Sequence, residues 1–486
     1  MQETLIGKFI AHYRLPAAAL DERRTLDQVM RTALDGSLER ALERAGAPGD
    51  GELCIRRIHA PVRLRLASTD AAMADEWSGA LAEEIARALL DGRAIFYRSR
   101  RQALMDMAMS VGRGDLSRAW AWRQLGLWRA SDLASESEAI FELTRALCSE
   151  QAAIVPALVA LADAGWFGRV ARRINSEQWV SLAITVAQEI GIARLIDEFE
   201  SAPSPRAMRE ALRVLNNSRL LRVAVVSQAL TGQRAEARRA VAALAAFETE
   251  PALLGTERAP ALIAIVAEAI CSSSSSAIEA LSEATGPEGV VVKPAETVIE
   301  DRDERVAERS GEESSPPDLR RRALTKFGGL LFLLGVVEEM KLAPEILASE
   351  PLGLRLLRWT MSSLALAIVP ARIDDPAALA FAGLPPGADP PLAAAEPMTE
   401  AEAAAIQALA ARVVGRLRGL LEWPDETAAT LIEFVCHRRA EIVAEPGWIE
   451  VKLSLDEVST EIRRAGLDLD PGYVPWLGVV IRIVYE

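Results

Sequence analysis

Glu433, His437 and Glu441 follow one another at intervals of four residues, with Cys436 beside them. On one continuous helix this spacing places the two carboxylates and the imidazole on the same face, which would be part of a four-ligand metal site. No second cluster of ligand residues accompanies them, and two arginines follow His437 directly. We therefore expect an ordinary helix surface with pairing between residues four apart, and no metal site.

Catalytic motifs are absent from the sequence. Three histidines are present, none in an H-E-x-x-H arrangement, and there is neither a G-x-S-x-G elbow nor a phosphate-binding G-x-x-x-x-G-K-[ST] loop. The turn GRGD at residues 112–115 lacks the Lys-Ser/Thr pair that would hold a nucleotide. The sequence therefore predicts no catalytic residue and no cofactor, and we expect a protein that is not an enzyme.

Tryptophan and arginine alternate in RAWAWRQLGLWR, residues 118–129. Both residue types are common at binding hot spots, and stacked rings would also suit single-stranded nucleic acid. The spacing of Leu116, Trp120 and Leu127 instead favours one helical face packed in the core, with the arginines reaching solvent. Core packing is the preferred interpretation, and a partner surface is the alternative. The candidate protein-binding residues are Trp120, Trp122, Trp128, Trp448, Tyr473 and Trp476.

Length and composition indicate a folded protein of several parts. The 486 residues are 50% hydrophobic and 26% charged, enough for more than one core. Fifty-five basic against sixty-nine acidic residues give a net charge of −14, which disfavours nucleic acid and anionic membranes as partners. Four scattered cysteines and a start without a signal-peptide pattern favour a reduced, cytoplasmic protein. No apolar run looks long enough for membrane insertion.

The sequence predicts a mainly α, multi-domain helical protein with small α/β units at both ends. Strand-like alternation over residues 5–13 and 52–66 is interleaved with helical spacing over 24–46 and 77–89. A run of serines and a Pro-, Gly- and acid-rich stretch mark a linker. The expected parts are a mixed α/β unit (1–99), a helical region (100–271), a flexible acidic Ser/Pro-rich linker (272–322), a second helical region (323–445) and a strand-helix-strand unit (446–486).

Two local patterns in the second half are especially clear. Thr399 and Glu402 have the spacing of a capping box, and an apolar face follows them as far as Leu420. Near the C-terminus, GWIEVKLSL and GVVIRIVYE alternate like strands on either side of a short helix that Asp456 is placed to cap. The order strand, helix, strand is therefore expected for the last forty residues.

Several of these stretches together resemble one known family. CIRRIHAPVRLRLASTDAAMADEWSGALAEEIARAL (residues 54–89) is an arginine-bearing strand followed by a helix, and KFGGLLFLLGVVEEM (326–340) and PLGLRLLRWTMSSLALA (351–367) are apolar helices. A proline-rich loop with the capped helix comes next, and residues 446–486 close the chain with a proline-tryptophan turn and a final strand. These segments resemble the tape measure proteins of contractile injection systems, the phage-tail-like particles that bacteria assemble in the cytoplasm. The helices of residues 100–270 match no part of that family.

The resemblance implies a non-enzymatic assembly factor that helps to set inner tube length and docks to tube, sheath or baseplate proteins. Such a protein would be cytoplasmic or incorporated into the assembled particle. As one continuous helix the chain would reach roughly 730 Å, but its prolines and glycines argue against a single rod. We therefore expect compact ends that act as attachment points. The alternative is a cytoplasmic helical scaffold or adaptor that binds another protein through the Trp/Arg stretch.

Overall fold

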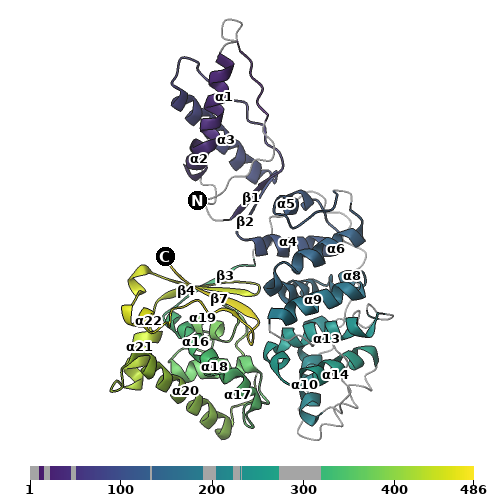
Figure 1. The fold of residues 1–486 in the computed structure, drawn as a ribbon, viewed down its shortest axis with the longest axis vertical. Helices are drawn as coiled ribbons and strands as arrows, with labels where there is room; N and C mark the ends of the chain where they lie inside the picture. Colours follow the sequence, from purple (N-terminus) through teal and green to yellow (C-terminus); the bar gives the residue numbers. More distant parts are fainter. Residues whose placement is uncertain are drawn as a thin grey trace. The chain divides into compact units, whose positions relative to one another are not determined.

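The computed structural model describes residues 10–15, 22–44, 51–131, 134–189, 204–222, 230, 233–272, 319–393 and 395–486. They belong to two compact units, which divide between Arg100 and Arg101. The described elements are mostly helices, with small sheets toward both ends, which confirms the predicted fold class (Figure 1). Most of the predicted linker lies outside the described residues. Of its described part, Ser272 ends a helix, while Arg321 and Arg322 begin a strand.

The first unit packs helices on a short antiparallel strand pair. Its elements are α1 (Arg23–Thr32), the π-helical turn η2 (Ala33–Ser37), α2 (Leu38–Arg44), β1 (Glu52–Ile55), α3 (Asp70–Leu90) and β2 (Ala94–Tyr97). Leu26, Val29 and Ala33 meet Met73 and Ala74 of α3 in a small core. The helices predicted over 24–46 and 77–89 are thereby confirmed.

Of the two strands predicted for this unit, the first is not formed in its described part, and the second is shorter than predicted. The one expected over residues 5–13 begins outside the described residues, and residues 10–15 are not part of a sheet. The one expected over 52–66 pairs only along β1, because the partner strand β2 supplies just four residues. Beyond Ile55, exposed and half-buried side chains continue to alternate, but these residues do not pair with a described strand.

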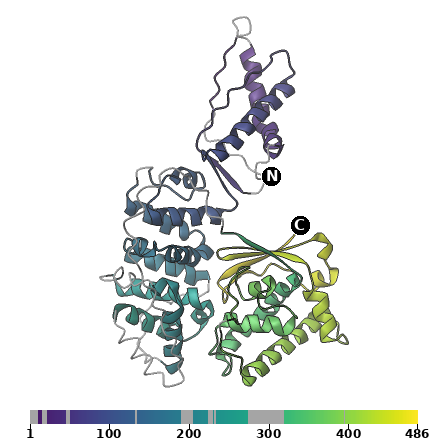
Figure 2. The same cartoon turned by 180° about the vertical axis from the view of Figure 1, so that it is seen from behind.

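The second unit begins with a stack of helices, here called the helical array (residues 101–272 as described). Its elements are α4 (Arg100–Arg113), α5 (Ala119–Gln124), α6 (Glu136–Leu147), η3 (Gln151–Ala153), α7 (Ile154–Asp163), α8 (Phe167–Ala171), α9 (Ser176–Glu189), α10 (Pro205–Asn217), α11 (Arg219–Arg222), α13 (Ala235–Thr249), η4 (Pro251–Gly255) and α14 (Ala259–Ser272). Helix α13 contacts α7, α9, α10 and α14. Its alanines from Ala237 to Ala246 are buried, and their small side chains allow these neighbours to pack closely. Figure 2 shows the stack of helices from behind.

The rest of the second unit, here called the sheet lobe (residues 319–486 as described), combines helices with a five-stranded mixed sheet. Its helices are η5 (Gly328–Phe332), α16 (Leu333–Glu339), α17 (Leu342–Ala348), α18 (Leu357–Ile368), α19 (Pro376–Phe381), α20 (Glu400–Leu421), α21 (Ala428–Cys436), η6 (Leu455–Glu457) and α22 (Thr460–Arg464). Its strands are β3 (Arg321–Thr325), β4 (Ala440–Glu445), β5 (Trp448–Leu453), β6 (Gly472–Val474) and β7 (Val479–Tyr485), in the order β3-β4-β5-β7-β6.

The two predicted C-terminal strands are confirmed as β5 and β7, which pair in parallel. They do not form a separate strand-helix-strand sheet, because β3, β4 and β6 join them through antiparallel pairing. The helix between them begins after Ser459, whose hydroxyl accepts the Ile462 N–H, so Asp456 is not its cap. Asp456 lies instead in the 3-10 turn η6.

The two faces of this sheet differ in chemistry. Ile442, Val451 and Ile483 share one row across β4, β5 and β7 and are buried against the helices of the lobe. On the opposite face, Glu441 of β4 is in register with Lys452 of β5. The alternation predicted from the sequence therefore separates a core face from a polar face.

Helix α20 is the longest described helix and confirms its predicted start. Thr399 accepts the Glu402 N–H, and the Glu402 carboxylate accepts the Thr399 N–H in return.

Among the described helices, none has by itself the length and apolarity to cross a bilayer; α6 together with residues 151–163 reaches that threshold only as a pair bent by 119°.

Candidate functional site at the junction of helices and sheet

Trp122 and Trp128 lie inside the helical array. Each is at most 1% exposed, and their ring centroids are 5.8 Å apart. Trp122 Nε1 donates to the buried Asp106 carboxylate at 3.1 Å, and Arg118 pairs with the same carboxylate at 2.5 Å. These contacts match the core-packing interpretation for both rings. Arg118, however, reaches into the core rather than into solvent.

The predicted helical face through Leu116, Trp120 and Leu127 is wrong. Helix α5 ends at Gln124, so Leu127 lies beyond it, and only Leu127 of the three is buried. Trp120 is half-buried. It is therefore the one tryptophan of this stretch whose ring a partner can reach directly.

Trp448 and Tyr473 fall on the same row of the sheet. Trp448 of β5 is in register with Val480 of β7, which is in register with Tyr473 of β6. Residues in register project to the same face, so both aromatic residues lie on the face opposite the lobe's core. The sequence presented these two residues as separate candidates, and the strand order places them on one row with Val480 between them.

Trp448 forms the first contact between the sheet lobe and the helical array. The guanidinium of Arg101, on α4, lies 3.6 Å from the Trp448 ring centroid, and the indole N–H donates to Glu450 at 3.1 Å. Arg101 also lies 3.6 Å from Glu445, which pairs with Arg320 at 3.0 Å. Burial lowers the pKa of Arg101, and the acidic neighbours oppose this effect. The contact combines a cation-π interaction with an ion pair.

The turn between β4 and β5 docks on the array by backbone approach. Gly447 has φ +76°, and a Cβ there would overlap the carbonyl oxygen of Ala152. A side chain is therefore excluded both by backbone conformation and by space. The sheet lobe contacts the array here without any side chain between the two backbones.

A buried carboxylate forms a second contact. Glu250, between α13 and η4, is 1% exposed, and its Oε2 accepts the Leu357 N–H at 2.9 Å. Burial raises its pKa to about 7, while this hydrogen bond and the charges of Arg213 and Arg358 act in the opposite direction. Burial also lowers the pKa of both arginines. Glu250 Oε1 and Arg358 Nε have no hydrogen-bond partner among the described residues.

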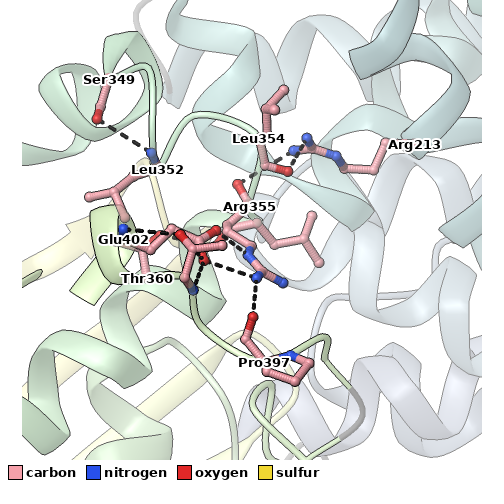
Figure 3. A network of polar contacts seen from close by, with 10 residues as sticks. Arg213, Ser349, Leu352, Leu354, Arg355, Thr360, Pro397 and Glu402 are labelled. Atoms are coloured by element: carbon pink, nitrogen blue, oxygen red, sulfur yellow. Dashed lines mark hydrogen bonds and ion pairs between the residues drawn. The ribbon is translucent and has the colours of Figure 1, made fainter. Parts of the chain in front are cut away.

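A chain of hydrogen bonds extends this contact into the sheet lobe (Figure 3). Arg213 of α10 donates to the Leu354 carbonyl at 2.6 Å, and Arg206 of the same helix donates to the Leu347 carbonyl. Arg355 then pairs with Glu402 through two bonds of 2.6 and 3.0 Å and also reaches the Pro397 carbonyl. The loop between α17 and α18 is thus held from both sides.

Glu402 performs two tasks in this network. It closes the capping box of α20 and accepts hydrogen bonds from Nε and Nη2 of Arg355. The hydrogen bond from Arg355 is the main reason that the pKa of Glu402 falls to about 2. The Glu402 carboxylate therefore binds both the start of α20 and, through Arg355, the loop between α17 and α18 that contacts the array.

Trp476 lies on the helix-facing side of the lobe. It is 8% exposed, and its indole N–H donates to Glu338 of α16. Its position fixes the turn between β6 and β7. A protein-binding role for the six aromatic residues stays a prediction.

The expected spacing of Glu433, His437 and Glu441 on one helix is wrong. Helix α21 ends at Cys436, and Glu441 belongs to β4. His437 instead packs edge-on against Phe327, with ring centroids 5.0 Å apart. No group of three potential metal ligands occurs within the described ranges.

Sequence reasoning missed the junction residues Glu250, Arg213 and Arg358. One signal was present for the first: Glu250 stands between the apolar run of α13 and the apolar turn PALLG. The arginines carry no such signal, because the sequence has many arginines in amphipathic helices. Comparisons with protein-family models, curated proteins and solved structures find no match to this chain.

Proposed function

We propose that this chain is a non-enzymatic assembly factor of a contractile injection particle, which docks to tube, sheath or baseplate proteins. The observation that carries the proposal is the junction, where Arg101, Gly447 and Glu250 join the helical array to the sheet lobe. A joined array and lobe can hold a partner on one side in a set position relative to a partner on the other. An assembly factor requires this property.

The part of the chain with the strongest family resemblance supports a docking role. Residues 446–486 supply β5, β6 and β7, so this segment is built into a paired sheet. The face of that sheet away from the lobe core carries Leu324, which is 80% exposed, and the exposed Arg482. Leu324 therefore offers an accessible apolar side chain on this face.

The dimensions favour anchoring over measuring by a single extended chain. The longest described helix, α20, has 22 residues and spans about 33 Å. A rod of several hundred ångströms would require both compact units to unfold. We therefore propose that the chain influences tube length by where it attaches.

Deletion of the gene in the native host tests this proposal. The expected result is no particles, or particles of altered tube length in electron micrographs, restored by the wild-type gene. Complementation with a chain lengthened by one turn in α6 separates two roles: unchanged tube length supports anchoring, and a proportional change supports a ruler. Particles of normal number and length in the deletion strain would contradict the proposal.

One observation favours the alternative of a cytoplasmic helical scaffold or adaptor. Phe141 on α6 and Ile184 on α9 are 55% and 42% exposed, and the two helices contact each other. Affinity purification from the native host distinguishes the two functions. Recovery of tube, sheath or baseplate proteins supports the first, and recovery of an unrelated protein that is lost on Phe141→Glu supports the second.

A further inference from the structure

Residues Arg57 to Arg65 of the first unit have the side-chain pattern of a strand, but none of the described strands lies beside them. Exposed and half-buried positions alternate through all nine residues. The half-buried ones are Ile58, Ala60, Val62 and Leu64, and the exposed ones are Arg57, His59, Pro61, Arg63 and Arg65. This is the period of a β-strand with one face against a core.

The inner face of this segment is anchored. Leu64 packs against the small core formed by α1 and α3, which includes Leu26 and Met73. Upstream, Cys54 and Ile55 pair with β2, and the segment follows this strand after a bend at Arg56. Its conformation is therefore set in advance, which reduces the entropy that a binding partner must offset.

The backbone of the segment is open. Within the described residues, the peptide groups from Arg56 to Leu64 form no hydrogen bond with other backbone groups, and the first bond beyond them is from Ser68 to the Arg65 carbonyl. An extended backbone with unpaired N–H and C=O groups is a template for an added strand. Pro61 lacks an N–H and interrupts the template at one position only.

The outer face is cationic. Arg57, Arg63 and Arg65 are exposed on this face, and Arg56 is exposed at the bend before it; none of the four forms an ion pair with the described residues. No acidic residue occurs between Glu52 and Asp70, although the chain as a whole carries a charge of −14. The segment is thus a local exception to the charge of the molecule.

We propose that residues 56–66 accept an extended acidic peptide segment of a partner protein by β-strand addition. Backbone pairing supplies the affinity, and carboxylates at alternate positions of the added strand lie beside the outward arginines. Nucleic acid fits less well, because phosphates do not satisfy a ladder of backbone donors and acceptors and the overall charge repels a polyanion. The inference depends on the first unit alone and not on the proposed function.

Fluorescence anisotropy with the full chain tests the proposal. The probe is a labelled ten-residue peptide that alternates Glu with Val or Thr. Three further probes are the same peptide with alternate amides N-methylated, a version with Lys in place of Glu, and a twelve-nucleotide oligo(dT). The acidic peptide is expected to bind saturably, at least tenfold more tightly than any of these three. Its binding is also expected to weaken with salt and to slow hydrogen exchange of residues 56–64 at least tenfold.

Paired variants locate the site. R63E/R65E is expected to weaken binding of the acidic peptide at least tenfold, whereas R234E/R439E, the same charge change at two exposed arginines of the second unit, leaves it unchanged. Because all four arginines are exposed, circular dichroism spectra should stay unchanged. Absence of saturable binding, equal binding of the N-methylated peptide, tighter binding of oligo(dT) or equal loss in both variants would each overturn the proposal.

Discussion

The carboxylate of Glu250 accepts a hydrogen bond at 2.9 Å from the backbone N–H of Leu357, 107 residues further along the chain. Glu250 follows α13 of the helical array, and Leu357 is the first residue of α18 in the sheet lobe. The bond therefore satisfies a helix N-terminal donor of one part with a side chain of the other. Arg213 and Arg358 supply the positive charge that keeps this buried carboxylate from being isolated.

Stability should depend on pH through Glu250. Its pKa is about 7 in the folded chain and near 4.5 in the unfolded chain, so folding takes up a proton between these values. The resulting stabilisation is complete below about pH 4.5 and is lost as the pH rises through about 7. Urea unfolding from pH 5 to 8 should show this decline in wild type and a smaller one in Glu250→Gln. Glu236→Gln, on the first turn of α13, is the control, and equal slopes for Glu250→Gln and wild type would refute the assignment.

A side chain at Gly447 should open the contact between the β4–β5 turn and the array. Gly447→Ala adds a Cβ that meets a backbone oxygen and also places a non-glycine residue at φ +76°. Gly387→Ala is a matched control, because Gly387 has φ +71° with open space around it. Gly387→Ala should lower the free energy of unfolding by about 1–2 kcal/mol, because only the backbone conformation is unfavourable. Gly447→Ala should lower it by about 2 kcal/mol more, because its Cβ also overlaps a backbone oxygen. Equal unfolding free energies for the two variants would show that the turn yields easily.

Loss of the Arg355 guanidinium should destabilise the chain in a pH-dependent way. The paired Glu402 has its pKa lowered to about 2, so its contribution is present above about pH 4.5 and is lost as the pH falls through about 2. Arg355→Met should cost about 1–3 kcal/mol at pH 7 and progressively less in acid. Arg412→Met, which breaks the exposed pair with Glu345, should cost less than about 1 kcal/mol. A cost for Arg355→Met that does not change with pH would contradict this account.

Removal of residues 482–486 should damage the sheet. The deletion takes away most of the pairing between β7 and β5 and the buried Ile483. Loss of that side chain alone costs about 1.5–3 kcal/mol, so the melting temperature should fall by several degrees. Arg482→Gln, which changes an exposed side chain of the same strand, should leave it nearly unchanged. A melting temperature equal to that of the full chain would show that the final strand is dispensable.

Local patterns in the sequence determined several elements. Thr399 and Glu402 define the start of α20 because a capping box involves groups within one turn. The alternation of Ile449, Val451 and Leu453 defines β5 because one buried face requires period 2. Such features depend on neighbours along the chain, and the residues themselves carry the information.

Only the tertiary structure decided which segments meet. Strand β3 pairs with β4 more than a hundred residues away, and β4 shows no clean alternation because Ile442, Val443 and Ala444 are all buried. Helix α21 stops at Cys436, where the chain turns into that strand, and this separates Glu433 from Glu441. In the sequence, Glu250 does not differ from the many acidic residues of the surface; in the structure it is buried against the start of α18. Burial and pairing depend on partners distant in sequence, so the junction exists only in the folded chain.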